Sequence, residues 1–412
     1  IRYAAAGISL SDLADKMGLT RAAVSLIVND LVESGVVQEA EIRSAPSGRP
    51  PVTLEINPQR GVVGGVDIGA THISIAIADF TARILQEVEI AFDIKNDPAA
   101  CLEIVQKYLL ELLGSQGLSR SDLAAVGVGV PGPVITEAGM VISPPIMPGW
   151  DRFPIRATLE KTWGCPVTLN NDAELGALGE WAYGAGRGER NLAYIKVGSG
   201  IGAGLILNQQ IYGGTTGAAG EIGHITIEEN GPLCNCGNRG CLEAFAGGYA
   251  IAREAQTMIR SGKRTLLADF PPEKINAREV ANAARRGDLH AQEILRRAGA
   301  HIGVALASLV NLFNPSVIII GGGVAEAGDI LTISIRDAVR ERAMRASEQS
   351  VRITTALLGR RSVLIGATVQ AINVAIHIAA EGKFSSTKET ALDMNAILGE
   401  TQLQGGGVIN RD

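Results

Sequence analysis

Apolar residues recur at helical spacing in two short segments near the start of the chain. Ser9 can cap the first helix and Thr20 the second, while Gly18 and Gly35 follow them as stop signals. The apolar face of the first segment consists of Leu10, Leu13, Ala14 and Met17. The apolar face of the second segment consists of Val24, Ile27, Val28 and Leu31. The pattern therefore predicts two helices joined by a tight turn.

An extended segment with a Gly/Pro-rich tip follows the second helix. The run from Gly35 leads into SAPSGRPP and then VTLEI, which predicts a two-stranded wing. Two helices and a wing outline a winged helix-turn-helix domain over residues 1–58. Such a domain places its second helix in the major groove of DNA. The candidate DNA-contacting residues are Thr20, Arg21, Ala22, Ser25, Asn29 and, at the tip of the wing, Arg49.

Beyond this domain, short apolar strands alternate with helical stretches. GVVGGVDIGATHISIAIADF predicts strand, glycine turn and strand, and NLAYIKVGSGIGAGLILNQQ repeats the same design. LAAVGVGVPGPV, PVTLNND and PSVIIIGGGVAEAG add further buried strands. The alternation predicts an α/β domain over residues 59–380, with two lobes and a cleft between them. Residues 381–412 form a C-terminal tail in this interpretation.

Composition changes this picture only at the N-terminal domain. The chain of 412 residues is 46% hydrophobic with a net charge of −6, as in ordinary globular proteins. We expect no membrane span and no secretory signal, and hence a cytoplasmic location. Residues 1–60 hold six Lys and Arg against seven Asp and Glu, which is a weak electrostatic basis for binding DNA. A protein-binding module is therefore an alternative, although no acid lies between Arg21 and Asn29.

Two glycine-rich turns could hold phosphate, because glycine lets backbone N–H groups approach oxygen atoms. The first turn contains Asp67, Gly69 and Thr71. The second turn contains Gly198, Ser199, Gly200 and Gly202. Neither fits the Walker pattern or a dinucleotide-binding fingerprint, and ordinary turn chemistry is the alternative for each.

Asn171 and Asp172 follow the apolar run PVTL at the expected C-terminal end of a strand. Ligand sites of α/β proteins gather at such strand ends. Asp172 could accept a proton from a sugar hydroxyl as a general base, and Asn171 could bind a neighbouring hydroxyl. A helix cap is an equally good interpretation of the pair.

Three of the five cysteines lie in the segment PLCNCGNRGCLEAF. An odd total and this clustering disfavour a disulfide framework. Cys234, Cys236 and Cys241 can instead supply three soft ligands to zinc, with His224 as the nearest candidate for the fourth. A closed site of this type would shape a loop and would not activate water.

Together these segments resemble the ROK proteins, which comprise repressors, open reading frames and sugar kinases. The motifs that carry the resemblance are EIGHITI with GPLCNCGNRGCLE, SGRPP, DIGATH, VPGPV, NNDA, VGSGIGAG and IIIGGG. The resemblance implies a two-lobed, actin-like/ribonuclease H-like sugar-kinase fold. Its small lobe would span about 61–182 plus 363–380, and its large lobe about 183–362. An N-terminal winged helix is typical of the ROK transcription factors.

The resemblance also implies roles for individual residues. The implied sugar-binding residues are Asn171, Asp172, Glu221, His224 and Glu243. Asp172 would be the catalytic base where kinase activity exists, and His224 would hold zinc with one ring nitrogen and sugar with the other. Gly322 corresponds to a glycine beside adenosine. Ala70 and His72 depart from the DIGGTK pattern of the kinases, and the methyl group of Ala70 would crowd a phosphate.

The sequence therefore predicts a sugar-responsive transcriptional regulator, a repressor of carbohydrate-utilisation genes that contains structural zinc. The alternative is an ATP-dependent sugar kinase with an added DNA-binding domain, which would use ATP and Mg²⁺. An adaptor that binds protein through its winged helix is a third possibility. We expect operator DNA and a sugar or sugar derivative as partners, and a homodimer or a dimer of dimers.

Overall fold

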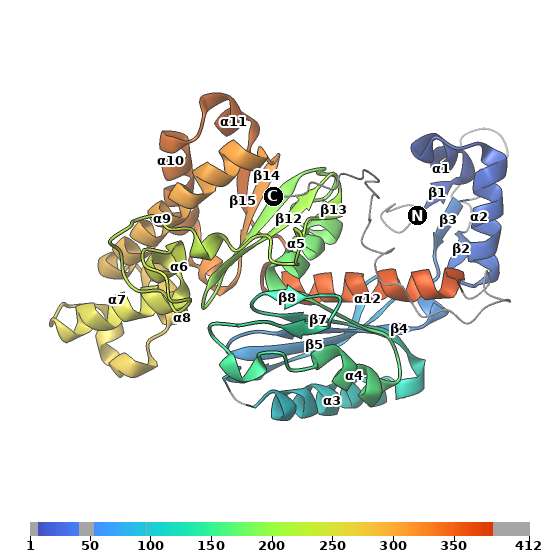
Figure 1. The fold of residues 1–412 in the computed structure, drawn as a ribbon, viewed down its shortest axis with the longest axis horizontal. Helices are drawn as coiled ribbons and strands as arrows, with labels where there is room; N and C mark the ends of the chain where they lie inside the picture. The colour runs from blue at the N-terminus through green and yellow to red at the C-terminus, as the bar shows by residue number, and fades with distance from the viewer. Residues whose placement is uncertain (1–6, 41–52, 96, 382–412) are drawn as a thin grey trace, which may run out of the picture.

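The computed structural model describes residues 7–40, 53–95 and 97–381 (Figure 1). Arg49 and the predicted wing tip lie outside these ranges, as does nearly all of the predicted tail. The N-terminal elements are β1 (Ile8–Ser9), α1 (Leu10–Met17), α2 (Arg21–Glu33), β2 (Val37–Ala40) and β3 (Thr53–Ile56). The strands form an antiparallel sheet in the order β1-β3-β2. The predicted winged helix-turn-helix is confirmed.

Both predicted caps of the winged helix are present. Ser9 Oγ accepts a hydrogen bond from the backbone N–H of Asp12 over 3.1 Å. Thr20 Oγ1 accepts one from the backbone N–H of Ala23 over 3.3 Å. These bonds satisfy N–H groups that lack a partner within the first turn of each helix, and they fix where α1 and α2 begin.

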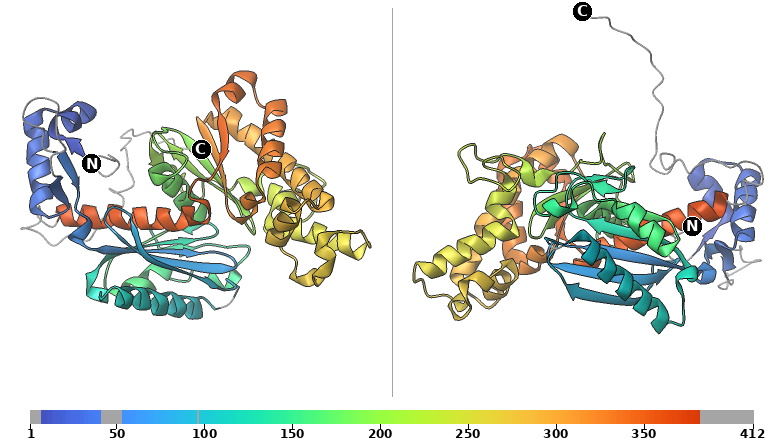
Figure 2. Two further views of the ribbon diagram at one scale, coloured as in Figure 1. Left: turned by 180° about the vertical axis from the view of Figure 1, so that it is seen from behind. Right: turned by 60° about the horizontal axis from the view of Figure 1, so that its bottom comes forward.

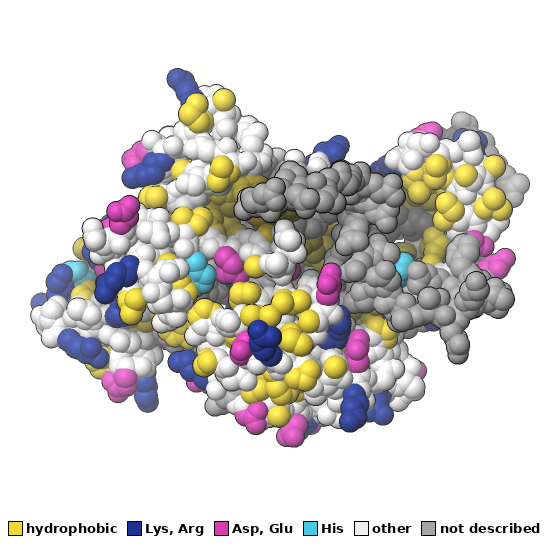
Figure 3. Space-filling model, in the orientation of Figure 1, with side chains coloured by type: hydrophobic (Ala, Val, Ile, Leu, Met, Phe, Trp, Pro, Cys, Tyr) yellow, Lys and Arg dark blue, Asp and Glu magenta, His cyan; other side chains and the backbone are white. Residues whose placement is uncertain are grey.

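The apolar faces of α1 and α2 are narrower than predicted. Leu13, Ala14, Val24 and Val28 are buried. Met17 and Ile27 were expected in the core, but they are 53% and 47% exposed. The two short helices turn only a narrow row of positions toward their shared core, and neighbouring apolar positions rotate outward. Hydrophobic side chains consequently gather on the surface of this domain (Figure 3), and the large exposed ones are Met17, Leu19, Leu26, Ile27 and Val32.

A five-stranded sheet follows, in the order β10-β7-β4-β5-β6. Its strands are β4 (Val62–Ile68), β5 (His72–Asp79), β6 (Ile84–Ala91), β7 (Leu123–Val130) and β10 (Val167–Asn171). The predicted β4–β5 hairpin is antiparallel, whereas β7 runs parallel to β4 and to β10. One face packs on α3 (Pro98–Ser115) and α4 (Ile155–Trp163), and the other on α12 (Ser362–Glu381). A small hairpin of β8 (Val134–Ile135) and β9 (Met140–Val141) adjoins this sheet.

The second five-stranded sheet has the order β13-β12-β11-β14-β15. Its strands are β11 (Leu192–Val197), β12 (Ile201–Leu207), β13 (Gln210–Ile211), β14 (Val317–Gly321) and β15 (Arg352–Thr355). One face packs on α5 (Asp172–Tyr183). The helices that share a core with the other face are α6 (Leu242–Ala246), α7 (Gly248–Arg260), α8 (Ala277–Arg285), α9 (Leu289–Phe313) and α10 (Asp329–Arg342). Helix α11 (Arg345–Ser350) packs on α9 and α10.

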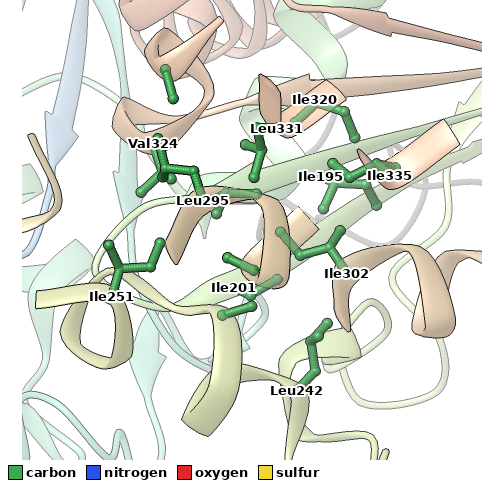
Figure 4. Packing of buried hydrophobic residues seen from close by; sticks show 14 of the residues in the cluster. Ile195, Ile201, Leu242, Ile251, Leu295, Ile302, Ile320, Val324, Leu331 and Ile335 are labelled. Carbon is green, nitrogen blue, oxygen red and sulfur yellow. The ribbon is translucent and has the colours of Figure 1, made fainter. Parts of the chain in front are cut away.

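The core beneath the second sheet is built mainly from isoleucine, leucine and alanine side chains (Figure 4). Ile195 of β11 and Ile201 of β12 point into it, and Leu242 at the start of α6 joins them. The next residues along the chain from Ile195 and Leu242 are Lys196 and Glu243. The packed core therefore sets the positions of two polar side chains that belong to the site described below.

Helices α5 and α12 lie between the two sheets and touch each other closely. A Cβ added at Gly366 of α12 would lie 1.8 Å from the carbonyl oxygen of Leu175, and one added at Gly179 would lie 2.2 Å from that of Ser362. Only glycine permits this separation of the helix backbones. Helix α12 continues to the winged helix (Figures 1 and 2), where Ile372 shares a hydrophobic cluster with residues of both domains.

Helix α12 is the one long apolar helix of this kind among the described residues. The segment Gly359–Ala380 is long and apolar enough to cross a membrane by length and composition alone. In the structure, 67% of its most apolar window is buried within the protein. Its hydrophobicity follows from packing against α5 and the first sheet, as in the central helix of a globular core.

Candidate functional site

Four potential metal ligands converge in the segment that the cysteine spacing singled out. The ligand atoms of His224, Cys234, Cys236 and Cys241 all lie within 4.8 Å of one another. His224 Nδ1 is 3.7 Å from Cys234 Sγ, and Cys236 Sγ is 3.7 Å from Cys241 Sγ. Sulfur atoms bound tetrahedrally to zinc at about 2.3 Å would be about 3.8 Å apart. The four residues therefore fit a metal ion such as zinc.

Short-range backbone pairing shapes this cluster. Thr226 bridges to Cys241, and Leu233 bridges to Arg239, so the cysteine segment folds as a small hairpin. The backbone N–H of Cys234 donates to the carbonyl oxygen of Asn238 over 2.8 Å. The three sulfur atoms are thus brought together by a local loop, which explains why their sequence spacing alone was informative.

The metal cluster is continuous with a group of acidic side chains. His224 ends the short helix η4 (Ile222–His224), and its Nε2 lies 3.8 Å from Glu221 Oε2. Burial raises the pKa of Glu221; His224 opposes this shift, and the negative charges of Asp172 and Glu243 add to it. Glu243 lies in the first turn of α6, directly after the N-cap Cys241 and Leu242. A metal at the cluster would therefore fix the His224 ring and the start of the helix that carries Glu243.

Asn171 and Asp172 lie where β10 ends and α5 begins. Asn171 Oδ1 accepts hydrogen bonds from the N–H groups of Ala173 and Glu174, at 2.8 and 3.4 Å, and its Nδ2 donates to the carbonyl oxygen of Gly132. The helix-cap interpretation of Asn171 thus describes its contacts in this structure. Asp172 is buried beside it and pairs with Lys196, whose Nζ is 2.5 Å from Asp172 Oδ2.

Lys196 is a functional candidate that the sequence reasoning missed. Burial alone would lower its pKa, but Asp172 and Asp67 outweigh that effect and raise it. Asp67 is buried at the end of β4; burial would raise its pKa, yet His72 and Lys196 together lower it. The signal in the sequence was a lysine within the otherwise apolar strand NLAYIKV.

Glu174 and Asn170 were missed as well. Both side chains are buried next to Asp172. Burial raises the pKa of Glu174 to about 7, although hydrogen bonds with Asn170 and the backbone of Asn171 oppose the shift. The run NNDAE at a strand end was the available signal. Of its polar side chains, only Asn171 and Asp172 were assigned a role.

A profile of the ROK family matches residues 63–374. The chain belongs to the ROK family. A profile described as winged helix-turn-helix DNA-binding matches residues 3–38. The chain therefore combines a ROK domain with a DNA-binding type of N-terminal domain.

Relatives of two kinds share this ROK domain. The chain is 31% identical to a putative xylose repressor of Caldicellulosiruptor sp., over 89% of this chain and 92% of that protein. It is 36% identical to a glucokinase of Halalkalibacterium halodurans, over 73% of this chain and 92% of that protein. A solved ROK family transcriptional regulator, described as a homolog of the E. coli MLC protein, matches with a TM-score of 0.76 and 28% identity over 90% of this chain and 93% of that one.

In each of the two glycine-rich turns of the ROK domain, a side chain of the protein itself fills the space next to a glycine. A Cβ added at Gly69 would lie 2.4 Å from the His72 ring, so that ring covers the first turn. A Cβ added at Gly200 would lie 2.2 Å from Glu243 Oε2, which accepts a hydrogen bond from the N–H of Ile201 over 2.9 Å. A role in binding a nucleotide stays a prediction for the residues of these turns and for the third glycine position, which are Asp67, Gly69, Thr71, Gly198, Ser199, Gly200, Gly202 and Gly322.

The candidate DNA-contacting residues lie on the winged helix, on a different domain from the acidic group. Thr20, Arg21, Ala22 and Asn29 are exposed, and Ser25 is half-buried. They occupy the N-terminal cap and outward face of α2, on the side of the helix that is turned away from the domain core. Their contacts with DNA stay a prediction.

A cavity of about 480 Å³ lies beside the site, between residues 203–225 and the C-terminal end of α9. Its lining is mainly apolar and includes Leu205, Tyr212 and Phe313. Of the residues predicted to bind sugar, only Glu221 reaches it. The acidic side chains of Asp172, Glu221 and Glu243 and the cavity are thus neighbouring features that share Glu221.

Proposed function

We propose that this ROK protein is a sugar-responsive transcriptional repressor, in which the ROK domain binds the sugar and the winged helix binds operator DNA. The similarity to a putative xylose repressor over 89% of the chain supports this function, because the match extends beyond the ROK domain. The match to a ROK family transcriptional regulator over 90% of the chain supports it in the same way. The glucokinase match is shorter.

One structural observation carries the proposal. Helix α5 begins at Asp172, within the acidic group, and packs along α12. Helix α12 in turn shares a hydrophobic cluster with Val24 and Val28 of α2, the helix proposed to enter the major groove. Close-packed interiors transmit displacements because their side chains interlock. A sugar that moves α5 would therefore change the orientation of α2.

The sugar would be held by hydroxyl contacts to Asp172, Glu221, His224 and Glu243, with Asn171 contributing through its remaining amide N–H. Carboxylates accept hydrogen bonds from hydroxyl groups, and His224 Nε2 lies on the Glu221 side of its ring. Zinc at Cys234, Cys236, Cys241 and His224 Nδ1 would be structural, because four protein ligands leave no open position. The zinc would hold the ring that contacts the sugar.

Repression requires that sugar and DNA favour different arrangements of the two domains. A ligand with equal affinity for both arrangements shifts nothing. Typical allosteric couplings of about 1–3 kcal/mol would change operator affinity roughly 5- to 150-fold, and DNA would weaken sugar binding by the same factor. A homodimer would present two winged helices to a palindromic operator, so a small reorientation would alter their spacing.

The test measures operator binding by fluorescence anisotropy at fixed salt while D-xylose or D-glucose is added, and sugar binding by calorimetry without DNA. We expect Glu221→Ala to lose the sugar response and keep operator affinity. We expect Arg21→Ala to weaken operator binding and keep sugar affinity. Operator affinity that is unchanged by every sugar of a wider panel would refute the sensor function.

A further inference from the structure

Lys196 is a largely buried cation beside Asp172, one of the residues of the proposed sugar site. It lies on β11 opposite Gly202 of β12 and Gly321 of β14, and the Tyr194 ring of the same strand fills the space beside Gly321. Its side chain is 16% exposed and that of Asp172 is 11% exposed. A hydrogen-bonded ion pair at this depth is only weakly screened by water or salt. The ammonium group is therefore a fixed part of the site.

The same ammonium acts on a second carboxylate, from the other sheet. Asp67 is the second-last residue of β4 and is buried, and its Oδ1 has no hydrogen-bond partner among the described residues. Lys196 is one of the charges that lower the pKa of Asp67. Without Lys196, two buried carboxylates would face the site, and Asp67 would keep only the contact with His72, 3.6 Å from its Oδ2, and the smaller influence of Arg360 to offset its charge.

A divalent cation such as Mg²⁺ takes carboxylate ligands from separate elements, as Asp67 and Asp172 are, and Asp67 Oδ1 is buried without a partner among the described residues. Here the Lys196 ammonium of the chain itself supplies the positive charge. The two glycine turns that could hold phosphate are covered in the same structure, by the His72 ring at Gly69 and by the Glu243 carboxylate at Gly200. Three side chains thus occupy the positions that a metal–nucleotide complex would need.

We propose that Lys196 is a resident counter-ion, which replaces a divalent cation between Asp67 and Asp172 and makes the site bind an uncharged sugar without metal or nucleotide. The proposal rests on the proposed function for the identity of the ligand as a sugar. Lys196 Nζ already donates to Asp172 Oδ2, so Oδ1 is the more available oxygen for a sugar hydroxyl. Glu221, Glu243 and Asp67 outnumber the single ammonium, which disfavours sugar phosphates and sugar acids.

The primary test is metal binding to the zinc-loaded full-length chain, with Mn²⁺ as a probe whose free form gives an electron paramagnetic resonance signal. We expect Lys196→Met to bind Mn²⁺ at least about tenfold more tightly than the parent, because removing the ammonium leaves two carboxylates uncompensated. Lys196→Arg keeps the charge and should behave as the parent. The exposed Lys161→Met is the matched control, and Lys196→Met combined with Asp67→Asn should lose the gain.

A folded Lys196→Met chain that binds Mn²⁺ no better than Lys161→Met would overturn the proposal. A parent chain that binds Mn²⁺ together with the ATP analogue AMPPNP would overturn it too, and this measurement does not depend on the stability of any variant. A second arm compares D-glucose with D-glucose 6-phosphate by calorimetry, and preferential binding of the phosphate would exclude the uncharged ligand. Loss of the sugar response on DNA would contradict the proposed function while leaving the Mn²⁺ result intact.

Discussion

Arg60 Nε donates a hydrogen bond to the carbonyl oxygen of Ser34 over 3.0 Å. The Asn57 side chain donates to the carbonyl oxygen of Gly35 over 3.0 Å, and the Asn57 backbone N–H donates to that of Val36 over 2.9 Å. These three bonds tie the segment that leads into β4 to the C-terminal end of α2. The winged helix is therefore held to the ROK domain by specific contacts, and the connection is shorter and stiffer than a free linker.

This connection gives the first prediction. Arg60→Ala removes one hydrogen bond, worth about 1 kcal/mol, from the path between α2 and the ROK domain. We expect sugar affinity to stay unchanged while the sugar-induced change in operator affinity falls by a factor of about five. Calorimetry and anisotropy on the same samples measure the two quantities. The exposed neighbour Gln59→Ala serves as the control, and equal responses from both variants would exclude a role for Arg60.

The second prediction concerns the metal. Elemental analysis of the purified chain should find about one zinc per chain, and Cys236→Ser should lose it and lower the unfolding temperature. Cys165 lies outside the cluster, so Cys165→Ser should keep the zinc. A chain that is metal-free, fully folded and responsive to sugar would show that the four ligands do not need an ion.

The third prediction follows from the raised pKa of Glu174, which is about 7 instead of 4.5. At pH values between 4.5 and about 7, Glu174 keeps its proton in the folded state, whereas the unfolded chain releases it. The contribution to stability is therefore present below about pH 4.5 and is lost as the pH rises through about 7. For the full shift the loss is on the order of 3 kcal/mol.

Urea unfolding at pH 5 and pH 8 tests this contribution. The parent chain should lose more stability between the two values than Glu174→Gln, which cannot ionise but keeps the shape of the protonated side chain. The difference between the two chains isolates Glu174, because all other titrating groups are common to both. Parallel pH profiles would contradict the prediction.

The fourth prediction concerns the contact between α5 and α12. In Gly366→Ala the new methyl group would meet the carbonyl oxygen of Leu175, so we expect a loss of about 1–3 kcal/mol and a weaker response to sugar. Gly114 of α3 has nothing within 4 Å of its Cβ position. Gly114→Ala should therefore be neutral or stabilise by up to about 1 kcal/mol. Similar stability of the two variants would show that the helices can separate without cost.

Local signals account for what the sequence predicted correctly. The caps Ser9 and Thr20, the two glycine hairpins and the three cysteines each depend on neighbours within a few positions, and all are present as predicted. The Lys196–Asp172 pair depends on how a strand of one sheet packs against α5. Such a contact cannot be derived from periodicity, which gives the face of an element but not its partner.

The two errors in the winged helix have a related cause. Helical spacing placed Met17 and Ile27 in the core, but spacing does not say how wide a face the neighbouring elements can cover. The spacing of apolar residues also could not predict that the His72 ring covers Gly69. His72 was noted as a departure from the kinase motif, and only the folded hairpin shows that its ring occupies the turn.

The place of α12 has a consequence for how the protein is made. A ribosome releases this helix after every other element that the structure describes, yet Ile372 and Ala375 complete the hydrophobic cluster that joins Val63 of the first sheet to Val36 of the winged helix. Chains fold from the N-terminus during synthesis, but here both N-terminal units lack part of their core until the end. A chain cut short by a premature stop codon would expose these apolar faces to chaperones and proteases, so truncated copies would be removed before they could compete for the operator.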